Sequence, residues 1–214
     1  GKFFNQPRAV IRPKPTRTFK DRLTQVAMSP ESGEEAAKLG AQMMAFNYKP
    51  MEVQKEEYEQ YKLKYVECHG RNPRPLLLTD MCICDSDASR AKENSKYIAN
   101  YLLSVLHHYD LMGDHYKNAK GYEAYGDAVD ALRETGKEGM MEAYVEGQIW
   151  GTPDQMLKKF EARKKEMGQT DCLMAFRFAG IDYKTAQRSQ KLFAEEVMPV
   201  LKSWEEDDAA EKAA

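Results

Sequence analysis

The stretch LTQVAMSPESGEEAAKLG, residues 23–40, joins a short apolar run to a charged segment through a turn with the letters SPES. Ser29 is a preferred residue for capping the start of a helix, and Pro30 suits the first helical position. Gly40 is a common residue just past the end of a helix. The stretch therefore predicts a buried strand, a tight turn and a helix over residues 30–39.

The same rhythm recurs three times along the chain. Further apolar runs predict strands, and charged segments after them predict helices: strands 41–46, 76–84 and 172–178, and helices 50–68, 88–106, 153–167 and 183–201. Four buried strands that are each followed by a helix predict an α/β fold with a parallel sheet, because parallel strands need crossover connections. An open doubly wound sheet and a (β/α)₈ barrel both fit this pattern, and no GxGxxG motif follows a strand to favour a dinucleotide-binding open sheet.

A complete barrel needs eight βα units and about 250 residues. The four units found here predict the C-terminal half of such a barrel, in one partial barrel domain over residues 1–204. Residues 111–150 interrupt the rhythm with glycines, tyrosines and short helical patterns, and we interpret them as a helical insertion. Residues 205–214 are acidic and alanine-rich, which predicts a disordered tail.

Composition excludes several classes of protein. The 32 basic and 34 acidic residues give a formal net charge of −2, so the chain lacks the basic excess typical of nucleic-acid binding. No run of 18 apolar residues predicts a membrane span, and the first residues have no apolar core of a secretory signal. The four cysteines match neither a disulfide framework nor a zinc site. We therefore expect a cytoplasmic protein with reduced thiols and no metal site.

The SPES turn is the strongest local candidate for a binding site. A helix N-terminus offers unpaired backbone N–H groups and a partial positive charge, and the hydroxyls of Ser29 and Ser32 add donors that suit a phosphate. An ordinary helix cap is the commoner use of such a turn. Arg177 is predicted at the carboxyl end of the fourth strand, where its guanidinium would meet an anion or a flat ring, or pair with a helix carboxylate.

Other chemically suggestive residues favour structural roles. His107 and His108 are adjacent on a predicted helix, so their side chains point about 100° apart and do not easily share one metal ion. Asp80 interrupts an apolar strand, where it either pairs with a basic residue or faces outward. Cys82 and Cys84 point to one side of that strand and are predicted to be small core residues.

Several stretches, taken in order, give the chain a wider resemblance. They are AMSPES with AAKLG (27–32 and 36–40), SVLHHY (104–109), WGTPD (150–154), FRFAG (176–180) and LFAEEVMP (192–199). With them the chain resembles the bacterial luciferase-like flavin-dependent monooxygenases. The resemblance implies a (β/α)₈ barrel that binds reduced FMN, which a separate flavin reductase supplies, and that uses O₂ to oxidise a small organic substrate. It also implies that Ser29, Glu31 and Ser32 contact the flavin phosphate, and that Arg177 lies near the flavin or the substrate.

The resemblance covers only the second half of the family pattern. The family's catalytic histidine comes from the part that precedes its fifth strand, and His69, His107, His108 and His115 do not match it, so the catalytic residues stay unknown. Met28 stands where relatives often carry a polar residue. We therefore expect a fragment with little activity alone, either a homo-oligomer or a partner of a missing N-terminal half. The alternatives are a non-catalytic flavin-binding or interaction protein on a degenerate half barrel, and an open-sheet phosphate-sugar enzyme.

Overall fold

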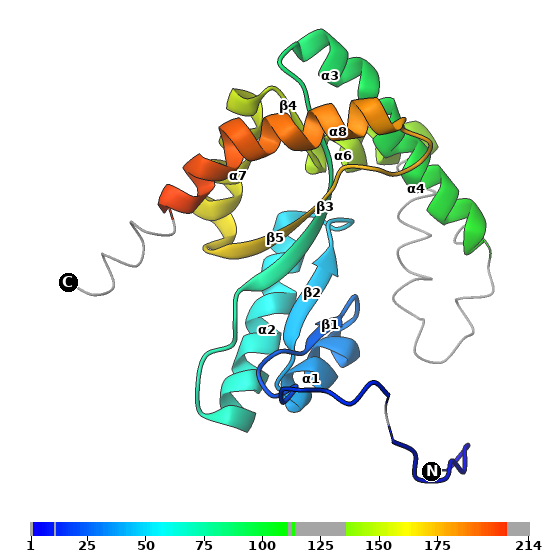
Figure 1. Ribbon diagram of the computed structural model, residues 1–214, viewed down its shortest axis with the longest axis vertical. Coiled ribbons are helices and arrows are strands. Elements are labelled where there is room, and N and C mark those ends of the chain that lie inside the picture. The colour runs from blue at the N-terminus through cyan, green and yellow to red at the C-terminus, as the bar shows by residue number, and fades with distance from the viewer. Residues whose placement is uncertain (1, 11, 111–112, 114–135, 205–214) are drawn as a thin grey trace.

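A computed structural model describes residues 2–10, 12–110, 113 and 136–204 of the chain (Figure 1). Its strands are β1 (Thr24–Val26), β2 (Gln42–Phe46), β3 (Leu76–Cys84), β4 (Ile149–Gly151) and β5 (Thr170–Ala175). Its helices are α1 (Pro30–Leu39), α2 (Met51–His69), α3 (Ala88–Asn94), α4 (Lys96–His108), α6 (Lys137–Gly147), α7 (Pro153–Met167) and α8 (Tyr183–Leu192). A π-helical turn, Phe193–Val197, extends α8 toward Trp204.

The strands form one parallel sheet with β3 at its centre. β1 pairs with β2, and Met44, Ala45 and Phe46 of β2 pair with residues 77–79 of β3. β5 pairs with residues 76–81 of β3, whereas β4 pairs only with its last three residues. The predicted α/β fold with a parallel sheet is therefore confirmed. All carboxyl ends of the strands point to the same end of the sheet, where βα connections gather.

Alternate residues of β3 pack against different helices. Leu76 and Leu78 lie in a core with α1 and α2, and Cys82 and Cys84 lie in a core with α7 and the π-helical turn. Met81 and Ile83, by contrast, pack against α4 and α6. Since side chains alternate along a strand, α2 and α7 cover one face of the sheet and α4 and α6 cover the other.

The structure corrects three details of the predicted elements. β4 is a fifth strand at the end of the range assigned to an insertion, and a strand of three residues is too short to give a periodic pattern. The predicted helix 88–106 is divided at Ser95 into α3 and α4. The last strand ends at Ala175, before Arg177. Tyr116, Tyr122, Tyr125 and the tail over residues 205–214 lie outside the described residues.

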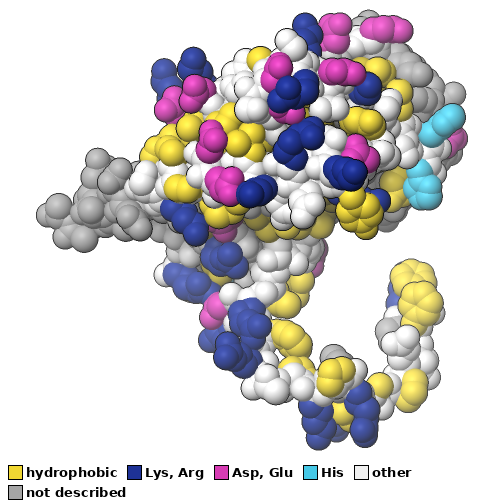
Figure 2. Space-filling view, turned by 45° about the horizontal axis from the view of Figure 1, so that its top comes forward, with side chains coloured by type: hydrophobic (Ala, Val, Ile, Leu, Met, Phe, Trp, Pro, Cys, Tyr) yellow, Lys and Arg dark blue, Asp and Glu magenta, His cyan; other side chains and the backbone are white. Residues whose placement is uncertain are grey.

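The first part of the described chain contains no helix or strand and stands away from the body (Figure 2). Residues 2–22 carry seven lysines and arginines and one aspartate. Their aromatic side chains Phe3, Phe4 and Phe19 are exposed. Within the ranges that the structure describes, no helix has the length and apolar character needed to cross a membrane.

Candidate functional site: the turn between β1 and α1

The SPES turn lies where the first strand ends and α1 begins. Ser29 has extended backbone angles, φ −136° and ψ 160°, and its Oγ accepts a hydrogen bond from the Ser32 backbone N–H at 3.3 Å. The carbonyl of Ser29 accepts from Gly33 N at 3.0 Å, Pro30 occupies the first turn, and Gly40 ends the helix at φ 68°. The predicted N-cap, first helical residue and C-terminal stop are therefore confirmed.

The hydroxyls of Ser29 and Ser32 have one O–H donor that their mutual hydrogen bond does not use. Ser29 Oγ and Ser32 Oγ are 3.1 Å apart, and both side chains are half-buried. Because the contact uses one of their two hydroxyl protons, the other proton is available for an outside acceptor. Glu31 is exposed, and its backbone N–H belongs to the first turn, where a helix supplies no acceptor of its own. This donor set suits a phosphate group, with the Glu31 carboxylate directed to solvent.

Lys49 lies beside the turn although its sequence context gave no signal of a site. It belongs to the connection from β2 to α2, which follows the carboxyl end of the neighbouring strand. Its Nζ donates to the Met28 carbonyl at 2.9 Å and to Glu57 Oε1 at 2.5 Å. Met28 Sδ also accepts a hydrogen bond from Phe46 N at 3.4 Å. These two hydrogen bonds thus connect the carboxyl ends of β1 and β2 next to Ser29, where the predicted phosphate site begins.

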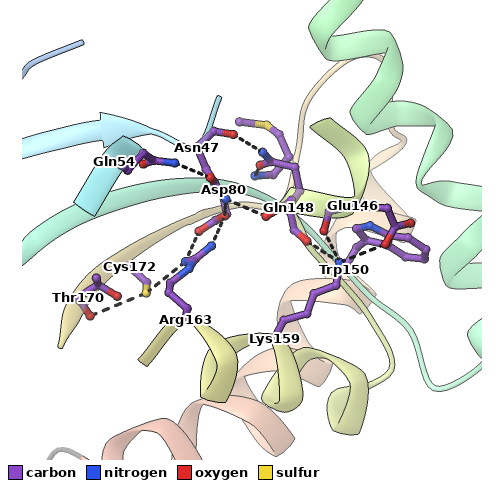
Figure 3. Close-up of polar contacts among 12 residues, drawn as sticks. Asn47, Gln54, Asp80, Glu146, Gln148, Trp150, Lys159, Arg163, Thr170 and Cys172 are labelled. Carbon is purple, nitrogen blue, oxygen red and sulfur yellow. Dashed lines mark hydrogen bonds and ion pairs between the residues drawn. The ribbon is translucent and has the colours of Figure 1, made fainter. Parts of the chain in front are cut away.

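A buried ion pair contacts Asn47, the residue that follows β2 (Figure 3). Arg163 of α7 donates through Nη2 to Asp80 Oδ1 at 2.7 Å and through Nη1 to Asp80 Oδ2 at 2.8 Å. The exposed fractions of the two side chains are 3% and 0%. Asp80 therefore pairs with a basic residue, which is one of the two alternatives left open by its position in the strand. Asn47 Nδ2 donates to the same Asp80 Oδ1 at 2.8 Å.

Aromatic residues gather near the carboxyl ends of the strands. Tyr48, just after β2, stacks on Tyr144 of α6 with ring centroids 5.3 Å apart, and its hydroxyl donates to Tyr101 of α4 at 3.4 Å. Tyr101 also contacts the edge of Phe178, which follows β5. Burial raises the pKa of Tyr48 and of Tyr144 well above the ordinary tyrosine value, so both stay neutral. This cluster links the α4–α6 layer to the same end of the sheet as the turn.

The structure does not bring Arg177 to the turn. Arg177 is exposed, and its guanidinium lies 3.8 Å from the centroid of the Tyr183 ring, a cation–π contact rather than a pair with a helix carboxylate. β1 and β5 are separated by β2 and β3 in the sheet. Ser29 and Arg177 share no hydrogen bond or ion pair, so Arg177 is a separate candidate at the same end of the sheet.

The cysteines and the histidines that the structure describes occupy structural or surface positions. His107 and His108 are exposed at the end of α4, and His69 Nε2 lies 2.7 Å from the Ala37 carbonyl. The described parts of the chain contain no cluster of three or more potential metal ligands, and His115 lies outside them. Cys82 and Cys84 are buried, as predicted, and burial raises the pKa of Cys84 to about 12.

The strands and helices define an α/β protein with a parallel sheet, and the turn predicted to bind a phosphate lies at the carboxyl end of β1. The model of the family described as luciferase-like monooxygenase matches residues 1–171, and the chain belongs to this family. The resemblance to this family, inferred from the order of the sequence motifs, is thereby confirmed. No curated protein matches the chain.

Solved structures share the fold at low sequence identity. The long-chain alkane monooxygenase LadA is 21% identical with a TM-score of 0.57, over 95% of this chain and 45% of its own. The oxygenating constituent of 3,6-diketocamphane monooxygenase from Pseudomonas putida, in complex with FMN, is 16% identical with a TM-score of 0.57, over 82% and 47%. An F420-dependent secondary alcohol dehydrogenase is 16% identical with a TM-score of 0.57, over 92% and 53%. The chain thus spans about half the length of these three enzymes.

Proposed function

We propose that this chain is the phosphate-binding half of a flavin-dependent monooxygenase that uses reduced FMN and O₂ to oxidise a small organic substrate. The observation that carries the proposal is the turn at the start of α1, where a spare hydroxyl proton and the Glu31 N–H lie at the carboxyl end of β1. Ser29, Glu31 and Ser32 would hold the phosphate. The bound flavin would supply the oxidation chemistry, and the protein would anchor, orient and shield it.

The proposal assigns separate tasks to the other residues at this end of the sheet. Tyr48, Tyr101 and Tyr144 would exclude water from the region next to the flavin. Burial raises the pKa of Tyr48 and of Tyr144 and keeps both neutral, and the Tyr48 hydroxyl donates to Tyr101 within the cluster. Arg177, stacked on Tyr183, would face the flavin or the substrate from the β5 side. No residue of this chain is proposed as a catalytic acid or base.

The proposal also concerns partners and compartment. A complementary βα half, from another part of a longer chain or from a second molecule, would complete the barrel, and a flavin reductase would deliver the reduced cofactor. Among the described residues β1 pairs only with β2, and β5 pairs only with β3. This pairing supports the proposal, because a strand edge without a partner recruits further strands. Four thiols without disulfides support a reducing compartment such as the cytoplasm.

A binding comparison tests the function. We expect the chain to bind FMN at least about tenfold more tightly than riboflavin, because riboflavin lacks the phosphate, and tenfold corresponds to about 1.4 kcal/mol. Isothermal titration with FMN, riboflavin and F420 measures this preference and also separates FMN from the deazaflavin cofactor. Equal affinity for FMN and riboflavin would refute the proposed phosphate site. Flavin binding without substrate oxidation, even after the complementary half is added, would favour a non-catalytic flavin-binding protein.

A further inference from the structure

We propose that Lys49 is a direct ligand of the cofactor phosphate and that a buried junction at Asn47 positions it there. The inference rests on the proposed function, because it takes the turn at Ser29 as the phosphate site. It adds a cationic side chain from a second βα connection to a site that was otherwise built from hydroxyls and backbone donors of one turn.

The ammonium group of Lys49 is placed one residue from the turn. Its Nζ lies 2.9 Å from the carbonyl oxygen of Met28, and the peptide bond of that carbonyl leads directly into Ser29. An ammonium group has three donors. The carbonyl of Met28 and the carboxylate of Glu57 account for two of them, and the side chain of Lys49 is 29% exposed. The third donor is therefore available to an anion at the start of α1.

The charges beside the turn favour an anion with more than one negative charge. Glu57 pairs with Lys49 and offsets part of its charge. A phosphate monoester carries up to two negative charges near neutral pH, and it competes better for an ammonium group than a neutral flavin ring does. The partial positive charge of the α1 N-terminus acts in the same direction. Lys49 should therefore discriminate FMN from riboflavin rather than strengthen the binding of both.

Asn47 is the fixed point from which the connection to Lys49 begins, and it is 8% exposed. Its Nδ2 donates to Asp80 Oδ1 and to the Gly147 carbonyl, both at 2.8 Å. Its Oδ1 accepts from Gln54 Nε2 at 2.8 Å, and its own carbonyl accepts from Gln148 Nε2 at 2.6 Å. Its backbone N–H donates to the carbonyl of Thr79. Every polar group of Asn47 is thus bonded (Figure 3).

The partners of Asn47 come from β3, α2, α6 and the residue between α6 and β4, so the junction defines the position of the connection. Asp80 of β3 is held by Arg163 of α7, and Gln148 precedes β4 and also accepts from Met81 N at 2.8 Å. Gln54 of α2 reaches back to donate to the Lys49 carbonyl at 2.7 Å. The backbone of Asn47 and of Lys49, on both sides of Tyr48, is therefore held by hydrogen bonds, and these bonds define the position of the Lys49 Cα.

Titration of FMN and riboflavin into the full chain and its variants tests the inference. Lys49→Gln removes the charge and should reduce the FMN preference about tenfold while leaving the riboflavin dissociation constant unchanged. Lys49→Arg keeps the charge and should retain most of the preference. Lys62→Gln is the matched control, because Lys62 is a half-buried lysine on α2 that pairs with Glu59 away from the turn, and it should change neither dissociation constant.

The positioning role is tested with Asn47→Ala and, as a milder change, Gln54→Met, with folding checked by circular dichroism. Both should lower the FMN preference at least about threefold with little change in riboflavin affinity, since the lysine is present but no longer held in place. A structural role alone would weaken both flavins equally and leave the ratio unchanged, which would overturn the positioning role. If the wild-type chain prefers FMN and Lys49→Gln keeps that preference, Lys49 is not a ligand; if the wild type has no preference, the proposed function itself fails.

Discussion

Replacing Arg163 by methionine is the perturbation with the largest expected effect on stability. The change removes two hydrogen bonds of 2.7 and 2.8 Å and leaves the fully buried carboxylate of Asp80 with the amide of Asn47 as its remaining side-chain donor. Breaking a buried ion pair by removing one partner costs about 3–5 kcal/mol, because the remaining charge is left uncompensated. For a chain of this size about 1 kcal/mol lowers the Tm by roughly 2–4 °C, so the expected loss is about 6–20 °C.

Urea unfolding followed by circular dichroism measures the loss in the free energy of unfolding, and thermal unfolding measures the loss in Tm. Two further variants test the cause. Asp80→Leu combined with Arg163→Met removes both charges and should recover most of the stability, because Asn47 keeps the Gly147 carbonyl as a partner. Arg71→Met removes an exposed partner of Asp21 and should cost less than about 1 kcal/mol. A loss below about 1 kcal/mol for Arg163→Met, or a double variant no more stable than the single one, would refute the reasoning.

Three further changes probe the turn, the core and a buried lysine. Ser29→Asp should preserve the helix cap and stability but abolish the FMN preference by repelling the phosphate, whereas Ser29→Ala should cost about 1 kcal/mol; thermal unfolding and titration separate the two effects. In the native protein a thiol reagent should leave Cys82 and Cys84 unmodified, with all four cysteines reacting after denaturation, and rapid labelling of more than two thiols would contradict the burial. Burial lowers the pKa of Lys159, so the folded chain binds that proton less tightly than the unfolded chain. Unfolding midpoints should therefore show wild type gaining stability relative to Lys159→Met as the pH rises from 7 to 10, and a relative loss would contradict this sign.

Features with a local physical cause were predictable from the sequence. Ser29 caps α1 as its position before Pro30 indicated, and Thr152 caps α7 with a complete capping box. Gly40 adopts the left-handed conformation that ends a helix without strain. Each of these signals depends on residues within one or two turns of chain, so one sequence contains all the information required.

Features that depend on distant residues were not predictable in the same way. Asp80 and Arg163 are 83 positions apart, and the sequence left open whether Asp80 was paired. Lys49 approaches Met28 only because β1 and β2 are neighbours in the sheet. β4 has three residues and is recognised by its pairing with β3 rather than by periodicity. These contacts arise from sheet order, which no local pattern encodes.

The central claim is that the turn at the start of α1 holds a flavin phosphate, and hydrogen–deuterium exchange with and without flavin tests it most directly. With FMN present, the account predicts slower exchange in peptides that contain the backbone amides of residues 31–33, and no such change with riboflavin. Protection of this turn that is equal for both flavins, or FMN-dependent protection confined to other parts of the chain, would contradict the claim.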